Sequence, residues 1–339
     1  MLERYPKFFE EFECLGGACP HTCCAQWEVV LDEETAAQYE ALEGELGDRI
    51  RRAMVRDADG DPCFPLNGGR CPFLDGENLC EIHRKLGQEA TSITCQEHPR
   101  FLEEYGPFRE ITLSASCPEA NRLLFAADTM EILERETDEA PEEGDEWLKG
   151  LLPLRATMLD ILREEARPIR ERLRDFLLLA AAAQELLEDE DLDALGALQA
   201  GQLSYDAVPE GPGLFPAALE FLKGLERLEA DWGELLEQAG RTGRGSCQEK
   251  QVQRVAEYAA FRYLLKCVND GDLLSRAQLC VFLALAAEKI GAVCGIPEAL
   301  RRLSCEIEHS DDNLELLLEA FWSRSEFGLE CFLRELSSV

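Results

Sequence analysis

Nine of the chain's fifteen cysteines lie within its first 117 residues, and this crowding constrains the N-terminal segment more than any other feature. The total is odd, and a reducing compartment disfavours a framework of disulfides. The first residues, Met1–Lys7, lack the charged-then-apolar pattern of a secretion signal. Metal binding or thiolate chemistry is therefore the leading interpretation of Cys14, Cys19, Cys23, Cys24, Cys63, Cys71, Cys80, Cys95 and Cys117.

Four of these thiols occur within eleven residues, in the pattern Cys14-x4-Cys19-x3-Cys23-Cys24. Two glycines and a proline interrupt the pattern, and glycine permits the tight turns that would wrap four thiols around one centre. Adjacent residues are awkward ligands for one small centre. Either one of the adjacent pair binds metal while the other packs, or each serves a different site.

A second set of cysteines follows, at Cys71, Cys80, Cys95 and Cys117. Soft thiolates select zinc, Cu(I) or iron–sulfur clusters. Four cysteines suit an iron–sulfur cluster, and they equally suit one or two tetrahedral zinc sites. We take this second set, together with members of the first, as the candidate ligands, and the sequence does not choose how many metals they share. Cys63 is equally consistent with a ligand and with a packed side chain.

The remaining six cysteines are spread thinly through apolar helical patterns. A free cysteine in such a setting is usually a small buried hydrophobe. We therefore predict packing roles for Cys247, Cys267, Cys280, Cys294, Cys305 and Cys331.

The charge of the chain restricts its partners. Asp and Glu total 68 against 34 for Lys and Arg, which gives a formal net charge of -34. Such a field repels a phosphate backbone, so nucleic acid is not an expected partner. No apolar run reaches the ~20 residues of a membrane-spanning helix, and the candidate Phe176–Ala183 is far too short. With 46% hydrophobic residues, these features predict a cytoplasmic protein with a buried core and no membrane partner.

Composition divides the chain into two domains and a linker. Residues 131–147 carry nine acidic residues and a proline, and the centre of this run, residues 137–145, cannot bury apolar surface. We predict a mainly α protein. Its cysteine-rich metal-binding domain, built from short strands, loops and helices, covers residues 1–130, and the acidic linker at 131–147 leads to a helical domain at 148–339.

Local patterns place the expected elements. Two short segments read as strands, Trp27–Leu31 and Arg109–Ser114. Glycine-rich loops are expected at residues 211–213 and 240–246. Helices are expected at Asp32–Leu46, Pro118–Glu134, Leu151–Leu187 with a break at Pro168, Ala217–Gln238, Cys247–Val268, Ser275–Cys294, Pro297–Glu308 and Asn313–Trp322.

An ordered series of short motifs carries a family resemblance. The motifs are Cys14-Leu15-Gly16-Gly17-Ala18-Cys19, Cys23-Cys24 with Trp27, Cys71-Pro72-Phe73-Leu74, Cys80-Glu81-Ile82, His98-Pro99-Arg100 and Cys117-Pro118-Glu119-Ala120. In this order they resemble the flagellin lysine-N-methylase family and, more distantly, the zinc- or iron-chelating clustered-cysteine proteins. The resemblance covers residues 8–127 in detail, and the helical remainder agrees mainly through residues 257–263.

The resemblance implies methyl transfer from S-adenosylmethionine to lysines on a protein surface, flagellin being the expected partner. It also implies an iron–sulfur centre, with 4Fe–4S as the expected form and zinc as the alternative. Arg100 is the candidate for pairing with the donor's carboxylate as a bidentate donor, and an ordinary structural salt bridge is its alternative role.

The sequence does not locate the donor site or a catalytic residue. Neither a strand–Gly-x-Gly-x-x-Gly–helix unit nor a Cys-x3-Cys-x2-Cys pattern is present. The target lysine must lose a proton, because its free pKa is about 10.4. Candidate bases or orienting groups near the cysteine motifs are His83, His98, Glu97, Glu119 and Tyr105. The alternative to an enzyme is a metal-stabilised scaffold whose acidic helical domain docks a basic partner.

Overall fold

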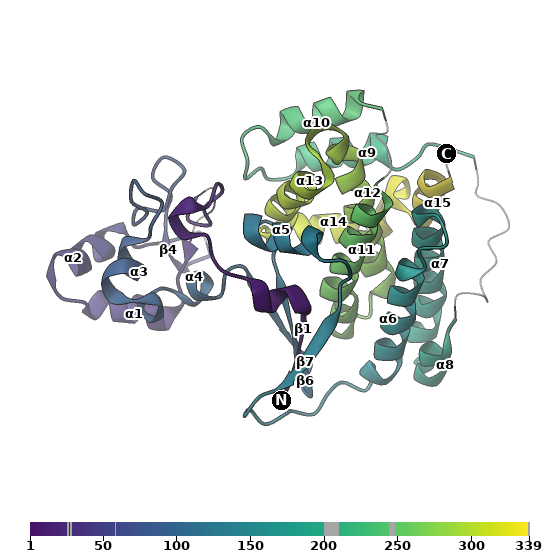
Figure 1. The fold of residues 1–339 in the computed structure, drawn as a ribbon, viewed down its shortest axis with the longest axis horizontal. Coiled ribbons are helices and arrows are strands. Elements are labelled where there is room, and N and C mark those ends of the chain that lie inside the picture. The colour runs from purple at the N-terminus through teal and green to yellow at the C-terminus, as the bar shows by residue number, and fades with distance from the viewer. Residues whose placement is uncertain (26, 28, 58, 200–209, 244–247, 338–339) are drawn as a thin grey trace. The chain divides into compact units, whose positions relative to one another are not determined.

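The computed structural model describes residues 1–25, 27, 29–57, 59–199, 210–243 and 248–337 (Figure 1). The structure is 60% helical, with short strands in the N-terminal region, so the predicted mainly α fold is confirmed. The chain forms two compact units. The cysteine-rich unit comprises Phe8–Leu102 and Ile111–Leu123, and the helical unit comprises Met1–Lys7, Glu103–Glu110 and Leu124–Val339. The units are therefore not consecutive segments of the chain.

The cysteine-rich unit is built from short elements around a small sheet. Antiparallel strands lie in the order β2-β4-β3, with Val29 opposite Phe64 and Val55 opposite Cys63. The elements are η1 (Lys7–Glu11), η2 (Gly16–Ala18), β2 (Val29–Val30), α1 (Glu33–Ala41), α2 (Gly44–Ala53), β3 (Val55–Arg56), β4 (Pro62–Phe64), α3 (Glu81–Leu86), η3 (Gln88–Ala90), α4 (Ile93–Glu97) and α5 (Pro118–Ala126).

The helix predicted at Asp32–Leu46 is two helices. Asp32 caps α1 as expected, and its carboxylate accepts a hydrogen bond of 2.8 Å from the Thr35 amide. The break falls before Gly44, whose φ of 89° is in the left-handed region that other residues rarely adopt. The two helices then pack against a core of eight buried residues, Val29, Leu31, Tyr39, Ile50, Phe64, Cys71, Phe73 and Ile82.

A four-stranded sheet runs in the order β5-β6-β1-β7, and it corrects two predictions. Its strands are β1 (Leu2–Pro6), β5 (Arg100–Glu104), β6 (Phe108–Leu113) and β7 (Ile132–Glu136). The segment predicted as the start of the acidic linker forms strand β7. All of its residues pair antiparallel with β1, which contributes apolar side chains. The helix predicted to reach Glu134 accordingly ends at Ala126. Residues 137–145 form a loop that is largely exposed, in line with the predicted character of that run.

The helical unit packs its helices around α12. The predicted break at Pro168 is confirmed, since Pro168 caps α7, whereas the helix predicted at Ala217–Gln238 is interrupted between α9 and α10. The elements are α6 (Leu148–Arg163), α7 (Ile169–Glu188), α8 (Leu192–Ala197), α9 (Phe215–Gly224), α10 (Trp232–Arg241), α11 (Glu249–Tyr263), η5 (Leu264–Asn269), α12 (Leu273–Cys294), α13 (Ile296–Leu303), η6 (Ser304–Glu308), α14 (Asp311–Ser323), η7 (Ser325–Phe327) and α15 (Leu329–Ser337).

Helix α12 is long and apolar enough to cross a membrane by length and composition alone. Its 22 residues include a window of mean hydropathy 1.7, and 67% of that window is buried. Helices α7, α10, α11, α13 and α14 all contact it. The core helix of a folded unit passes the same test, and in the described part of the chain α12 is the one helix that does so.

A buried carboxylate organises the π-helical turn η6. Glu308 accepts hydrogen bonds from Arg262 Nε at 2.8 Å and from Tyr263 at 2.7 Å, and Tyr258 and Ser304 donate to it as well. All of these residues are buried. Burial raises the pKa of Tyr263, so its phenol stays protonated and donates. The Glu308 carboxylate and the Arg262 guanidinium compensate each other's loss of hydration. Removal of either one would leave the other as a buried charge without a partner.

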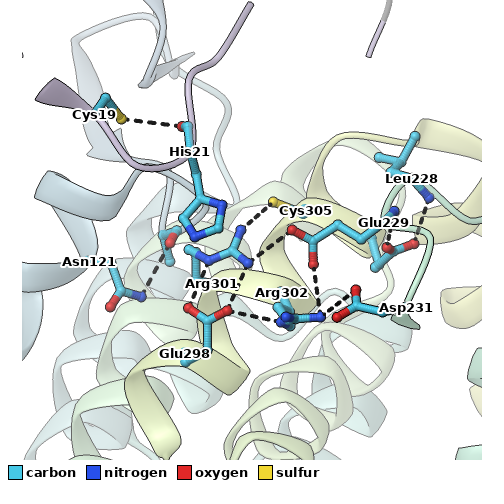
Figure 2. Close-up of polar contacts among 12 residues, drawn as sticks. Cys19, His21, Asn121, Leu228, Glu229, Asp231, Glu298, Arg301, Arg302 and Cys305 are labelled. Atoms are coloured by element: carbon cyan, nitrogen blue, oxygen red, sulfur yellow. Dashed lines mark hydrogen bonds and ion pairs between the residues drawn. The ribbon is translucent and has the colours of Figure 1, made fainter. Parts of the chain in front are cut away.

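Figure 2 shows a second ionic network, which fastens the loop before α10 to α13. Arg301 contacts Glu229 at 2.9 Å and Glu298 at 2.8 Å, while Arg302 contacts Glu298 at 2.9 Å and Asp231 at 2.8 Å. Beneath it the buried Glu306 carboxylate accepts the backbone N–H groups of Leu228 and Glu229, at 3.0 and 2.7 Å. The loop is thus held by both side-chain and backbone contacts.

The pH dependence of stability should reveal Glu306. Burial raises the pKa of Glu306 to about 7, and the charge of Glu229 adds to this effect. A carboxyl group whose folded pKa exceeds its unfolded value favours the folded state most at low pH, and its contribution is lost as pH rises from about 4.5 to 7. We expect the free energy of unfolding of the wild-type protein to fall over this interval relative to that of Glu306→Gln, which has no ionisable group at this position. An equal pH slope in the two proteins, measured by urea unfolding, would contradict the assignment.

Candidate metal centre

All eight predicted ligands lie in the cysteine-rich unit as free thiols. Cys71 is buried, whereas Cys14, Cys23 and Cys95 are exposed. The other four are half-buried, at Cys19, Cys24, Cys80 and Cys117. The described cysteines include no disulfide, which keeps every one of these sulfurs available for coordination.

Backbone pairing brings three of the thiols into one region. The Cys71 amide donates to the Cys24 carbonyl at 2.8 Å, beside a bridge between Ala25 and Arg70. A further bridge joins Leu74 to Cys80, and Cys80 is the residue that precedes the first turn of α3. Residues almost fifty positions apart in the sequence are therefore joined by hydrogen bonds.

Cys95 joins the same set from α4. Ser92 caps this short helix and accepts a 3.3 Å hydrogen bond from the Cys95 amide. Partial loss of water around the sulfurs, together with repulsion from the thiolates of Cys24 and Cys80, raises the pKa of Cys95 to about 11 and that of Cys71 to about 12. These four sulfurs lie close enough to repel one another when ionised, and a bound cation would remove that repulsion.

The four remaining thiols of the predicted set, Cys14, Cys19, Cys23 and Cys117, form a second neighbourhood. Burial raises the pKa of Cys117, and repulsion from Cys19 and Cys14 contributes. The Cys14 sulfur accepts the Gly16 amide at 3.4 Å, and the Cys19 thiol donates to the His21 carbonyl at 3.3 Å (Figure 2). These contacts hold the sulfurs within the turns that the glycines permit.

The adjacent cysteines differ in the direction in which their pKa values shift. The Cys23 thiol donates a hydrogen bond to the Cys24 sulfur, which lowers the pKa of Cys24 and raises that of Cys23. Thr22 and the positive charge of Arg70 also favour the Cys24 thiolate. Cys24 is electrostatically coupled to Cys71 and Cys80, whereas Cys23 is coupled to Cys14 and Cys95. The pair therefore connects the two neighbourhoods.

Among the described residues, no three Cys, His, Asp or Glu side chains converge as the ligands of one ion. The donor chemistry nevertheless fits zinc or iron, since eight reduced thiols are gathered in one small unit. The structure thus places the predicted ligands in one region without forming a finished coordination shell.

The other cysteines have structural settings. Cys63, which the sequence left open, is 1% exposed in β4 and packs within the small sheet. In the helical unit Cys267, Cys280 and Cys331 are buried, and Cys294 and Cys305 are half-buried, in agreement with packing roles. Cys247 lies outside the described residues.

Arg100, the candidate for binding the donor, stacks on aromatic rings. Its guanidinium lies 5.6 Å from the Phe9 ring centre and 5.5 Å from that of Phe12. Such cation–π contacts hold the group in place without using its hydrogen-bond donors, so the planar fork is still suited to a carboxylate. The aromatic partners were not anticipated from the sequence.

The candidate bases have contrasting environments. Burial lowers the pKa of His98 to about 4, and its ring meets the Trp27 ring edge-on at 5.0 Å. Glu119 is paired with Arg122 at 2.7 Å, which lowers its pKa. Burial raises the pKa of Tyr105. These three groups are poor bases at neutral pH as they stand.

The gathered free thiols of this unit define a clustered-cysteine class of protein. Residues 13–143 match the family described as "Putative zinc- or iron-chelating domain". This match includes all eight predicted ligands.

Curated relatives identify the family more closely. The flagellar biosynthetic protein FliU of Salmonella muenchen is 32% identical in an alignment of 143 residues that covers 39% of this chain and 82% of FliU. The lysine-N-methylase of Salmonella typhimurium is 33% identical in an alignment of 141 residues that covers 38% of this chain and 34% of the relative. The lysine-N-methylase of Salmonella choleraesuis matches to the same extent. The chain belongs to the family of these FliU and lysine-N-methylase proteins. Its match spans only about a third of each lysine-N-methylase, and no solved structure matches it significantly.

Proposed function

We propose that this protein is a protein-lysine N-methyltransferase that uses S-adenosylmethionine and an iron–sulfur centre to methylate surface lysines, with flagellin as the first substrate to test. The observation that carries the proposal is membership in a family whose relatives include lysine-N-methylases. The metal-chelating region supports the requirement for a metal.

The thiolates of the cysteine-rich unit would hold the metal. We assign Cys24, Cys71, Cys80 and Cys95 as one ligand set, because backbone pairing and mutual repulsion connect them. The rest of the predicted ligands, Cys14, Cys19, Cys23 and Cys117, form the adjoining set. If only three thiolates of one set held a 4Fe–4S cluster, the remaining iron would supply a site for the donor's amino and carboxylate groups.

Other residues bind and steer. The Arg100 guanidinium would pair with the donor's carboxylate through two parallel hydrogen bonds. The net charge of -34 favours encounter with a lysine-rich surface through long-range attraction. In the reaction the lysine nitrogen forms a bond to the methyl carbon while the sulfur–carbon bond breaks, and the sulfonium becomes a neutral thioether. The lysine must therefore lose its proton before the transfer, and we assign no residue to that step.

Transfer of labelled methyl groups tests the proposal. Anaerobically purified, metal-loaded protein should incorporate label from S-adenosylmethionine into lysines of Salmonella flagellin. Arg100→Ala should raise the dissociation constant for the donor about tenfold, because a charge-assisted bidentate pair is lost. Arg52→Ala, an exposed arginine of the same unit, is the matched control and should leave donor binding unchanged. Absence of donor-dependent labelling by fully metallated protein would contradict the enzyme.

A metal-stabilised scaffold is the second candidate. The observation that favours it is the small core of the cysteine-rich unit, in which Cys71 itself is one of eight members and Cys24 and Cys80 pack against it. Such a unit draws folding energy from a structural ion. A brown protein with visible iron–sulfur absorption favours the enzyme, whereas a colourless protein with one or two equivalents of zinc favours the scaffold.

A further inference from the structure

A groove of about 560 Å³ opens in the helical unit, distant in sequence from the cysteines. Its lining comes from the start of α6, the end of α7, the start of α12 and the end of α14. Figure 1 shows these helices within the helical unit. The most unusual lining residue is Trp322, which is 71% exposed, the largest exposure of any large hydrophobic side chain described.

Two indole rings give the groove apolar walls. The Trp147 ring packs close to Gly271, where a Cβ would come within 3.3 Å of the ring. Trp322 lies in the last turn of α14, next to the buried Phe321, so its backbone is anchored while its ring is exposed to a ligand. Gln184 fixes the start of α12 by donating to the Gly271 carbonyl at 3.0 Å and accepting the Leu273 amide at 2.9 Å. The walls are therefore preformed.

The groove is also acidic. Three carboxylates line it, Glu188, Asp270 and Asp272, and no lysine or arginine among the described residues does so. Arg276 neutralises Asp270 from outside the lining, and Asp272 caps α12 through the Ser275 amide at 2.9 Å. In the described part of the chain Glu188 and Asp272 have no ion pair, so the lining keeps an excess of negative charge.

Indole faces and carboxylates together suit one kind of ligand, a positively charged group at the end of an aliphatic chain. A lysine side chain places its methylenes on the rings and its ammonium over an indole face and near the carboxylates. An uncharged apolar segment would instead bury carboxylates without partners, and a phosphate would be repelled.

We propose that this groove binds a lysine side chain of the partner protein. This inference rests on the proposed function only for the methylation of the bound lysine. The binding itself follows from the lining.

Equilibrium binding tests the groove directly. The probe is a glycine- and serine-rich peptide with blocked ends and one central lysine, titrated into metal-loaded full-length protein by calorimetry. Replacing the lysine with acetyl-lysine should weaken binding at least about tenfold, because the charge is removed. Trp322→Ala should weaken it about tenfold, and Glu188→Gln should weaken it as well. Trp322 is exposed, so its replacement should not disturb folding.

Matched variants and a second assay separate the possible outcomes. Leu316→Ala on α14 and Glu185→Gln on α7 change exposed residues outside the groove and should bind the probe normally. Equal binding of the lysine and acetyl-lysine peptides, or normal binding by Trp322→Ala, would overturn the proposal. Probe binding without methyl transfer would retain the groove and reject the proposed function. Methyl transfer whose KM for the protein substrate is the same in the wild type and in Trp322→Ala would retain the proposed function and reject the groove.

Discussion

Serine in place of Cys95 should lower the metal occupancy of the set Cys24, Cys71, Cys80 and Cys95 to less than about a tenth of the wild-type value, since a soft ligand is replaced by a hard one. Metal held by the adjoining set should stay. Cys95 suits this test because it is exposed, so the change removes little packing. Elemental analysis after anaerobic purification measures the effect. Loss of the metal should also lower the thermal stability of the cysteine-rich unit, because metal binding contributes directly to the folding of such small domains.

Cys294→Ser is the matched control. Cys294 is half-buried at the end of α12 in the helical unit, and its thiol contacts only backbone carbonyls among the partners described. It should retain the full metal content. A Cys95→Ser protein with wild-type metal content would remove Cys95 from the ligand set, and a loss in the control would indicate general misfolding rather than ligand removal.

Replacing Glu308 with glutamine should lower the free energy of unfolding by about 3–5 kcal/mol. The substitution preserves the size of the side chain but removes the negative charge that compensates Arg262. The new amide N–H groups would also face hydroxyl donors such as Tyr263, which are buried with Glu308. Chemical denaturation followed by circular dichroism, which reports mainly on the helical unit, is the appropriate measurement.

Glu315→Gln provides the comparison, because Glu315 is exposed on the neighbouring helix α14. It should change stability by no more than about 0.5 kcal/mol. If Glu308→Gln is as mild as this control, the buried network does not contribute to stability in the way its geometry indicates. The Arg262→Met variant would then show whether the guanidinium is tolerated only because of Glu308.

Much of the helical unit was predictable because apolar periodicity is local. The break at Pro168 follows from its missing N–H, and α12 and α14 begin within two residues of their expected starts. The errors occur where a distant partner decides the outcome. Leu2–Pro6 has no strong strand signal of its own, and it becomes β1 because it pairs with β6 and β7.

The metal site was predictable as a set of residues but not as an arrangement. Spacing identifies clustered thiols, and it cannot show that Cys24 and Cys71 are joined through their backbones while Cys63 is in the sheet interior. Arg100 was selected for its charge. The aromatic rings that contact its guanidinium belong to Phe9 and Phe12, about ninety residues earlier in the sequence. Side chains that meet only after folding leave no periodic pattern in the sequence.

The position of β1 has a consequence for synthesis on the ribosome. This strand lies between β6 and β7, which are translated more than a hundred residues after it. Until Glu136 has emerged, the nascent chain carries a strand with no complete set of neighbours. The cysteine-rich unit ends at Leu123 and can therefore be complete before the sheet closes. If that unit fails to fold in time, β1 stays exposed as an unpaired strand that invites aggregation.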